Sequence, residues 1–407
     1  MPVEQPEPSA RPAPEFIALV ALTMSMVAMS IDSMLPALAD IARELGAANP
    51  NDRQLVLTTF FVGLTGGIAF WGPVSDSAGR KRTLFASIAL YTAGGLVCAL
   101  SRTFAVMLVG RTIQGIGAAG PRIVALAMVR DLHAGRRMAR VMSFVTSVFI
   151  LVPILAPSIG QAVLLVAHWR AIFFGLVGVA LIDAAWLALR QPETLPRTRR
   201  VRFSLRTILR GVIEALTTRI TFGYTLATGL VFGAFISYLG TSQQIFQELY
   251  GLGRLFPVYF GILATSLGVA SIVNARLVMR FGMRTLSKWA LRADCALSVV
   301  CLPLFWALGG HPPLWLFMLY MIGFFFCNGL LFGNYNARAM EPMGHIAGVA
   351  AAVIGSLGTT VALIAGTPIG RMYDGTVIPL VAGFTALGIA ALVCTEWAER
   401  SPAARPT

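Results

Sequence analysis

A carboxylate and a guanidinium occur inside otherwise apolar stretches of this 407-residue chain. Asp32 lies in the stretch that begins near Phe16, and Arg111 lies farther along, three residues before Gln114. An acid at the centre of a membrane-spanning helix costs about 3 kcal/mol, so such a residue usually faces a cavity or a partner. Asp32 is therefore a candidate proton-binding residue, with Arg111 as its counter-charge. The alternative is that Asp32 lies close enough to the outer interface to be hydrated.

Helix geometry places these two charges at a similar depth. With a rise of 1.5 Å per residue, Asp32 lies about 24 Å and Arg111 about 20 Å from the cytoplasmic edge. If the two side chains are adjacent, they stabilise each other in a medium of low dielectric constant. If an aqueous pocket separates them, they supply a proton site and a counter-charge. The sequence leaves both arrangements open.

The composition requires these charges to be considered within a membrane. Hydrophobic residues make up 57% of the chain and charged residues 12%, and the mean hydropathy is +0.75. These values exclude an ordinary soluble globular protein. We predict an all-α integral membrane protein with twelve spans of about 20 residues. The apolar stretches are 16–37, 54–75, 83–101, 104–127, 141–165, 169–190, 220–246, 255–277, 286–308, 313–338, 346–368 and 375–396.

The distribution of charge predicts how the chain crosses the membrane. The net charge is +14, but Lys and Arg cluster in every second loop instead of forming one basic face. Nucleic acid is therefore not an expected partner, whereas a lipid bilayer is. Loops rich in cations remain on the cytoplasmic side, so we expect both termini there.

The loops offer little for catalysis. They contain no nucleophile–base cluster and no set of metal ligands. The longest polar interval has about 29 residues, far below the size of a typical domain. The five cysteines lie singly in apolar stretches, where they act as small core residues. We therefore expect no enzyme, no metal site and no cofactor, with a proton gradient as the energy source.

That longest interval divides the apolar stretches into six and six. In it, Leu205 and Leu209 recur at near-helical spacing beside Arg206 and Arg210, which predicts an amphipathic helix on an anionic membrane surface. We predict a cytoplasmic tail at 1–15, an N-terminal six-helix half at 16–190, a basic amphipathic cytoplasmic linker at 191–219, a C-terminal six-helix half at 220–397 and a cytoplasmic tail at 398–407.

A weak internal repeat supports two related halves. The segment around Gly282 and Arg284 follows a Gly- and Arg-containing loop about 200 residues earlier. Pro157 and Gly160 likewise recur approximately as Pro368 and Gly370. Repeats of the same orientation are related by an axis along the membrane normal.

The earlier of these loops separates the second and third apolar stretches, and its spacing of Asp, Gly and three cations is specific. The residues with this spacing are Gly72, Asp76, Gly79, Arg80, Lys81 and Arg82. The pattern resembles the signature loop of the major facilitator superfamily of transporters. The resemblance implies twelve helices in two pseudo-symmetric halves and a role for this loop in conformational gating. A basic turn after any helix would carry cations without the fixed Asp and Gly spacing.

Further motifs resemble one group within that superfamily. Arg111, Gln114 and Gly115 are similar to the fourth-helix motif of proton-coupled drug exporters. Pro153, Pro157 and Gly160 are similar to the antiporter motif of the fifth helix, where small residues and prolines let helices pack closely and bend. The segments 130–140 and 341–348 resemble the bicyclomycin and chloramphenicol resistance branch. The resemblance implies a monomeric multidrug:proton antiporter of the bacterial inner membrane.

Three polar residues in the C-terminal half, Tyr238, Gln243 and Asn328, are candidates for binding substrate together with Asp32, Arg111 and Gln114. Ordinary hydrogen bonding between helices is the alternative for these three. The many aromatic and Met residues favour small hydrophobic or amphipathic drugs as substrates. A proton-coupled carrier of a cellular metabolite on the same fold is the alternative function.

Three further charged residues, Asp183, Arg292 and Asp294, are expected near helix ends. Charged side chains at such positions commonly reach toward the membrane surface. We therefore assign them no functional role.

The first prediction concerns Asp76. Its carboxylate is expected near Gly348 at the start of the eleventh span, where unpaired backbone N–H groups and the helix dipole favour an anion. Asp76→Asn should weaken that contact and bias the carrier toward inward opening. Cysteine accessibility on the two membrane faces measures this bias, and equal accessibility in the variant and the wild type would contradict it.

Overall fold

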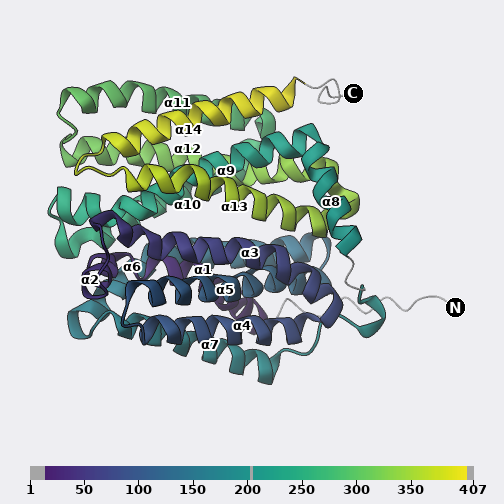
Figure 1. Cartoon of the computed structure of the whole chain (residues 1–407). Helices are drawn as coiled ribbons and strands as arrows, with labels where there is room; N and C mark the ends of the chain where they lie inside the picture. The colour runs from purple at the N-terminus through teal and green to yellow at the C-terminus, as the bar shows by residue number, and fades with distance from the viewer. Residues whose placement is uncertain (1–13, 202–204, 401–407) are drawn as a thin grey trace.

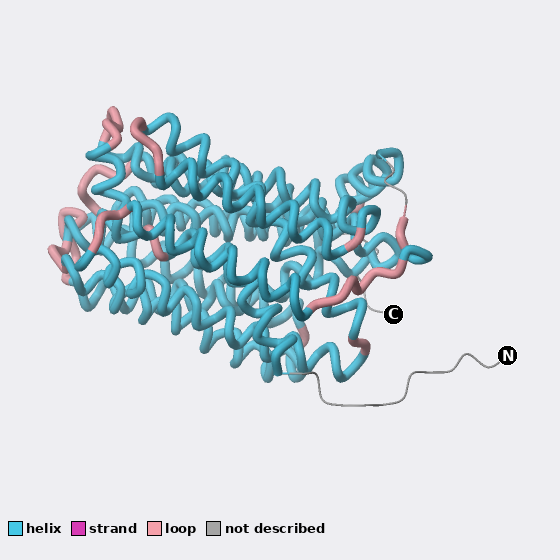
Figure 2. Tube along the Cα trace, turned by 90° about the horizontal axis from the view of Figure 1, so that it is seen from below, coloured by secondary structure: helices cyan, strands magenta, loops and turns pink. Residues whose placement is uncertain are grey.

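The structure is a computed structural model that describes residues 14–201 and 205–400. Most of the predicted tails, 1–15 and 398–407, lies outside these residues. The described chain is helical and contains no strand, and its loops gather at the two ends of a bundle (Figure 2). Each of the twelve predicted spans lies on a helix, which confirms the predicted fold class.

The N-half contains the helices before the polar interval. They are α1 (Pro14–Asp32), α2 (Leu38–Glu44), α3 (Leu55–Ala78), α4 (Arg80–Ala99), α5 (Phe104–Leu132), α6 (Gly135–Val166) and α7 (Arg170–Arg190). Two 3₁₀ turns, η1 (Leu35–Ala37) and η2 (Pro50–Gln54), connect α1, α2 and α3. The first predicted span, 16–37, is broken after Asp32, because Pro36 lacks the N–H that a continuing helix requires.

The C-half contains the helices after the interval. They are α9 (Arg219–Gln243), a π-helical turn η4 (Gln244–Leu249), α10 (Phe256–Phe281), α11 (Met283–Ala307), α12 (Leu314–Met340), α13 (Ala347–Arg371) and α14 (Ile378–Glu399). In Figure 1 the N-half forms the lower part of the bundle and the C-half the upper part. The described chain begins with α1 and ends with α14 at the right-hand end of this view, which also contains the turn between α3 and α4 and is called the Arg80 end. The opposite end, where α13 ends at Arg371, is called the Arg371 end.

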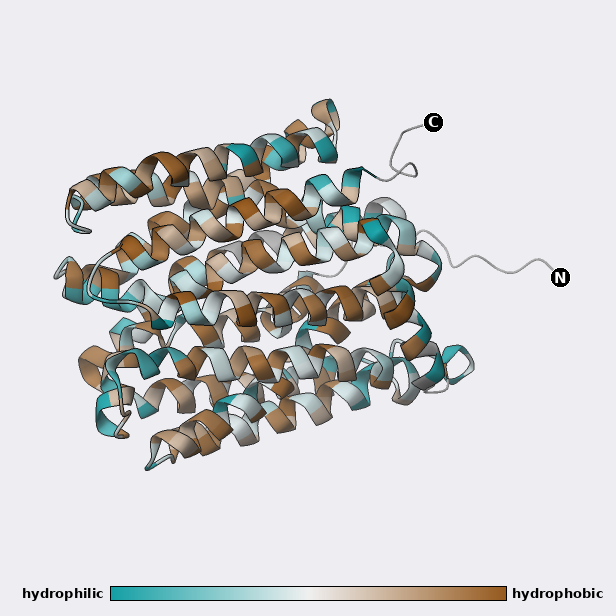
Figure 3. Cartoon of the chain, turned by 45° about the horizontal axis from the view of Figure 1, so that its top comes forward, coloured by the Kyte–Doolittle hydropathy of each residue, from teal (hydrophilic) through white to brown (hydrophobic). Residues whose placement is uncertain are grey.

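The distribution of hydropathy along the bundle matches a membrane protein. In the described residues, ten helical stretches are long and apolar enough to span a bilayer, and one of them contains both α12 and α13. Apolar residues cover the length of the helices, whereas hydrophilic residues gather at the two ends (Figure 3). The chain is therefore a multi-pass membrane protein.

Glycines allow the helices within the N-half to approach closely. A Cβ atom at Gly63 of α3 would clash with the carbonyl oxygen of Thr112 of α5, and one at Gly117 would clash with the Tyr91 backbone of α4. Helices in lipid associate through such van der Waals packing, since lipid supplies little hydrophobic drive. Between the halves, α3 packs on α13 and α6 packs on α10.

A helix also forms in the predicted linker, α8 (Leu205–Thr217). Its Gly211 and Ala215 are buried, and a Cβ at Gly211 would clash with Val349 of α13. Leu209 and Ile213 are exposed by 54% and 60%. α8 therefore packs one face on α13 and presents apolar side chains elsewhere, as an amphipathic helix does.

The close approach of α3 and α5 gives a second prediction. Gly63→Ala should lower the thermal midpoint of the purified protein, because overpacking a tight contact costs about 1–3 kcal/mol. Gly66→Ala on the same helix is the matched control, since a Cβ there meets no atom within 4 Å. Equal midpoints for the two variants in a thermal melt would show that this contact is not tight.

Candidate functional site

Asp32 ends α1 near the middle of the bundle and is only 5% exposed. Among the described residues, no hydrogen bond or ion pair reaches its carboxylate. Tyr238 on α9, in the C-half, lies close enough for its hydroxyl to interact electrostatically with this carboxylate. The predicted proton-binding residue is therefore buried, unpaired and directed toward the other half.

Tyr238 belongs to a buried aromatic cluster of the C-half. Its ring stacks on Phe260 with a centroid distance of 5.8 Å and meets Phe325 edge-on at 4.9 Å. Its hydroxyl is buried and has no hydrogen-bond partner in the described part of the chain. Asn328, on α12, likewise has a buried Oδ1 atom without a described partner, while its Nδ2 donates to the carbonyl of Phe324 at 2.8 Å. Unpaired polar atoms within an aromatic surface can bind an amphipathic molecule.

Arg111 is fully buried on α5 and is stabilised without a carboxylate. Its Nε donates to the carbonyl of Val56 at 3.0 Å, and its Nη2 donates to the carbonyl of Ser30 at 3.2 Å. Its Nη1 donates to Oε1 of Gln114 at 2.6 Å, and the guanidinium lies 4.3 Å from the Phe60 ring centroid. The two predicted charges thus lie at a similar depth, since Ser30 is two residues from Asp32, but no ion pair joins them.

Gln114 and Tyr91 complete this polar cluster in the N-half. The hydroxyls of Tyr91 and Ser30 share a hydrogen bond of 2.6 Å. The Gln114 Nε2 is buried and lacks a partner among the described residues. This amide nitrogen carries two N–H donors and lies near the Tyr91 hydroxyl, so it can donate to that hydroxyl or to a bound molecule.

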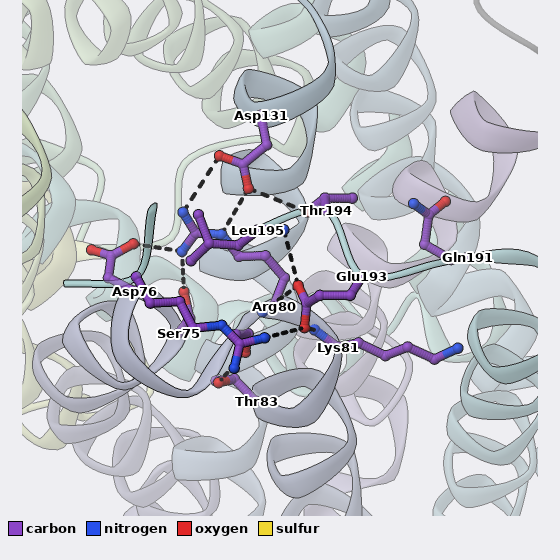
Figure 4. A network of polar contacts seen from close by, with 12 residues as sticks. Ser75, Asp76, Arg80, Lys81, Thr83, Asp131, Gln191, Glu193, Thr194 and Leu195 are labelled. Atoms are coloured by element: carbon purple, nitrogen blue, oxygen red, sulfur yellow. Dashed lines mark hydrogen bonds and ion pairs between the residues drawn. The ribbon is translucent and has the colours of Figure 1, made fainter. Parts of the chain in front are cut away.

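The signature loop forms a second polar cluster, at the Arg80 end (Figure 4). Gly79 connects α3 to α4 with φ = 103°, a conformation that side chains disfavour. The buried Arg80 donates from Nη1 to Asp76 at 2.5 Å and to Ser75 at 2.6 Å, and from Nε to Asp131 at 2.9 Å. These bonds connect the ends of α3, α4 and α5 within one half.

Glu193, which the sequence analysis did not single out, also belongs to this cluster. Its Oε1 accepts from the backbone N–H of Arg80 at 2.9 Å, and its Oε2 accepts from the backbone N–H of Lys81 at 3.3 Å (Figure 4). A carboxylate there matches the positive end of α4. Of the other predicted loop residues, Arg82 is exposed, and a Cβ at Gly72 would meet no atom within 4 Å. No described hydrogen bond or ion pair joins Asp76 to α13, where Gly348 lies.

The C-half repeats the arrangement at the same end. Gly282 connects α10 to α11 with φ = 78°. Arg284 and Arg338 both bind the carboxylate of Glu399, at 2.5 Å and 2.8 Å. The weak sequence repeat around Gly282 thus corresponds to a repeated cluster of one glycine turn, arginines and a carboxylate.

At the Arg371 end, by contrast, polar contacts join the two halves. Arg53 of η2 donates to Oε1 of Gln243 at 2.7 Å and to the carboxylate of Glu248. Gln54 donates from Nε2 to Oε1 of Gln244 and to the carbonyl of Gly370, both at 2.8 Å. Arg53 and Gln54 are only 7% and 3% exposed, so these bonds are largely shielded from water.

Two more residues of the same turn extend this inter-half network. Asn51 donates to the carbonyls of Arg371 and Tyr373, at 3.0 Å and 2.8 Å. Asp52 accepts from Nη2 of Arg371 at 3.1 Å. The structure therefore places Gln243 in the network that holds this end together, five residues from Tyr238. In the sequence, the signal for this inter-half network is the run of four polar residues at 51–54, directly before the apolar helix α3.

The residues of the predicted fifth-helix motif lie where α6 meets α1. Pro153 and Pro157 lie inside α6, where each removes a backbone hydrogen bond. A Cβ at Gly160 would clash with the carbonyl oxygen of Ser33, the residue after Asp32. Gly160 therefore sets the close approach of α6 beside the candidate proton site.

The locations of two buried acids, Asp183 and Asp294, differ from those expected from the sequence. The expectation that they reach toward the membrane surface is wrong, since they are 0% and 4% exposed. Asp183 accepts a hydrogen bond from Thr23 of α1 at 2.8 Å. Asp294 has a buried Oδ1 atom with no partner among the described residues. Both acids point into the bundle because their helix faces pack on neighbouring helices.

Comparisons with known proteins agree with this geometry. A sequence model described as Major Facilitator Superfamily matches residues 20–367. The chain is 30% identical over 356 residues to the uncharacterized MFS-type transporter YdgK of Bacillus subtilis, covering 86% of this chain and 87% of that protein. It is 29% identical to a bicyclomycin resistance protein homolog of Haemophilus influenzae, covering 90% and 91% of the two chains.

Two further comparisons concern another relative and a solved structure. Multidrug resistance protein MdtL of Klebsiella pneumoniae is 29% identical over 334 residues, 80% of each chain. The crystal structure of a D-xylose-proton symporter has a TM-score of 0.74 at 15% identity, covering 94% of this chain and 97% of that one. At that identity the structure shows a shared fold and nothing about substrate.

The network at the Arg371 end gives a third prediction. Arg53→Gln removes a charged donor that bridges the halves, so this end should open more often. A cysteine at Ser237, which is 1% exposed in α9, should then react with a maleimide on the order of tenfold faster in the detergent-solubilised protein. Labelling of the wild-type chain, with its five native cysteines, supplies the background rate.

Arg43→Gln is the matched control for this measurement, because Arg43 pairs only with Asp40 on the same short helix among the described residues. It should leave the labelling rate unchanged. A rate in Arg53→Gln that equals the control rate would show that the network does not hold the halves together.

Proposed function

Because this chain belongs to the major facilitator superfamily of transporters, we propose that it is a proton-driven exporter of small amphipathic or hydrophobic compounds. Family membership makes it a membrane transporter rather than an enzyme, and transporters of this family typically need no cofactor. The names of its relatives, bicyclomycin resistance homolog and multidrug resistance protein, support export of drugs.

The observation that carries the proposal is the unpaired carboxylate of Asp32. On the N-half side, Arg111 already has hydrogen-bond partners for its guanidinium. On the C-half side, the Tyr238 hydroxyl has no hydrogen-bond partner among the described residues. Arg111 lies at a similar depth, where its guanidinium binds the carbonyl of Ser30, and a fixed positive charge inside the bundle lowers the cost of an ionised carboxylate there. Substrate at Tyr238 and a proton at Asp32 then compete for the same small volume.

Alternating access requires that the two ends open in turn. The inter-half network at the Arg371 end supports an assignment of this structure to the state closed on that side. We assign Gln243 to this closure, with Arg53 and Gln54. Pro153, Pro157 and Gly160 would let α6 bend as the halves rock. In the other state, Asp76 would approach the start of α13 and hold the opposite end closed, as the sequence analysis expects.

Energetics and topology complete the proposal. The membrane potential contributes about 2.3 kcal/mol for each net charge that enters per 100 mV, which is enough to drive export against a gradient. The excess of cations in alternate loops favours a bacterial inner membrane location with both termini in the cytoplasm. The aromatic surface of Tyr238, Phe260 and Phe325 favours drugs over a polar metabolite.

Proteoliposomes with an imposed pH gradient test the central claim, with lipophilic cations and phenicols as candidate substrates. In the wild type, adding a substrate should release protons. Asp32→Asn should abolish this drug-dependent flux, because an amide cannot carry the proton. Asp40→Asn is the matched control, since Asp40 is exposed and pairs only with Arg43 among the described residues.

Three outcomes separate the alternatives. Loss of flux in Asp32→Asn alone supports antiport with Asp32 in the coupling path. Equal flux in wild type and Asp32→Asn would place the proton site elsewhere. Absence of flux with every drug, together with flux driven by a metabolite, would favour the metabolite carrier.

A further inference from the structure

An open groove lies between the two halves, on the side of the bundle at the Arg371 end. Its volume is about 670 Å³, within the range of pockets that hold small ligands. Thr58 of α3 lines one side, and residues 363–372 of α13 line the other. α3 and α13 pack side by side, so the groove follows an inter-half seam that borders the surrounding lipid (Figure 1).

The wall of the groove is apolar and exposed. Ile364 and Met372 are 71% and 67% exposed, and Leu363 and Pro368 also line the groove. One polar atom, the Oγ1 of Thr367, is buried here and has no partner among the described residues. Such a surface in a spanning helix contacts acyl chains, because hydrocarbon is the solvent at this depth.

A positively charged side chain lies at the end of this apolar wall. Arg371 is the last residue of α13, and its side chain is 50% exposed. Its Nη2 donates to Asp52, and no other described residue binds its guanidinium, so several of its five N–H donors are free. An arginine at the end of a span lies at the level of the lipid headgroups.

We propose that this groove binds one phospholipid, with its phosphate on Arg371 and one acyl chain along Leu363 and Ile364. A guanidinium recognises phosphate through paired, charge-assisted hydrogen bonds. A rotation of the Thr367 side chain would bring its hydroxyl, now buried without a described partner, to an ester oxygen of the lipid. The site requires neither the proposed substrate nor Asp32.

This lipid has a consequence for the conformational cycle. It contacts α3 of one half and α13 of the other, and its phosphate binds the arginine that bridges the halves through Asp52. A ligand that binds one conformation better than another shifts the population toward it. Bound lipid therefore favours the state in which the Arg371 end is closed.

Native mass spectrometry of the full-length protein titrated with phosphatidylglycerol tests the site. Arg371→Gln should weaken binding of one lipid on the order of tenfold, the usual effect of losing a charge-assisted hydrogen bond. Asp52→Asn keeps the Arg371 charge and frees one more donor, so lipid should bind at least as well. Arg254→Gln, an exposed cation in the 3₁₀ turn η5 (Gly253–Leu255) before α10, is the matched control and should bind like the wild type.

A second pair of variants tests the apolar wall without disturbing folding. Ile364→Gln should weaken the same binding event, whereas Val393→Gln, at an equally exposed site on α14, should not. Binding in Arg371→Gln that equals binding in Arg254→Gln would overturn the proposal. Full displacement of the lipid by millimolar inorganic phosphate would also overturn it, because the groove would then be an anion site alone.

Discussion

Every buried polar group in this molecule must find its partner inside the protein, because the hydrocarbon around it offers none. Arg111 meets this requirement with two backbone carbonyls and an aromatic face from neighbouring helices and with one amide, that of Gln114, from its own helix. Close glycine contacts between α3, α4 and α5 bring those groups within reach. Asp32 differs from Arg111, since its carboxylate has no hydrogen bond or ion pair among the described residues, and the Oδ1 atom of Asp294 is likewise buried without one. Under the proposed function, proton binding gives Asp32 a reason to remain unpaired.

Polar side chains are paired in different ways at the two ends of the bundle. At the Arg80 end, Asp131 of the N-half and Glu193 of the linker both bind groups of the N-half, and Glu399 binds groups of its own C-half. At the Arg371 end, the polar side chains of the five-residue turn η2 form hydrogen bonds and an ion pair with residues of the C-half. Contacts within a half survive a rocking motion, whereas contacts between halves must break. Among the described residues, the polar contacts that must break when the Arg371 end opens therefore come largely from η2.

Sequence reasoning reached the features that depend on local pattern. The length of each apolar stretch predicted its helix, and glycine spacing located both turns, at Gly79 and Gly282. It failed where a partner comes from far along the chain. Nothing near Glu193 indicates that it binds the N-terminus of α4, and nothing near Asp294 shows which helix face packs inward. The rise per residue of a helix predicted the depth of Asp32 and Arg111 in the membrane. It could not predict whether the two form an ion pair, because Arg111 binds groups of Val56, Ser30 and Gln114 instead.

The arrangement of α9 connects the centre of the molecule with its closed end. Tyr238 faces Asp32 at the candidate proton site, and Gln243, about one and a half turns farther along the same helix, binds Arg53 in the inter-half network. A helix moves as a stiff element over so short a distance, so a displacement of Tyr238 is transmitted to Gln243. The chain uses a π-helical turn, η4, directly after this helix, and such turns are frequent at functional sites. Under the proposed function, proton binding and closure would therefore act on one structural element, which is the physical requirement for coupling them.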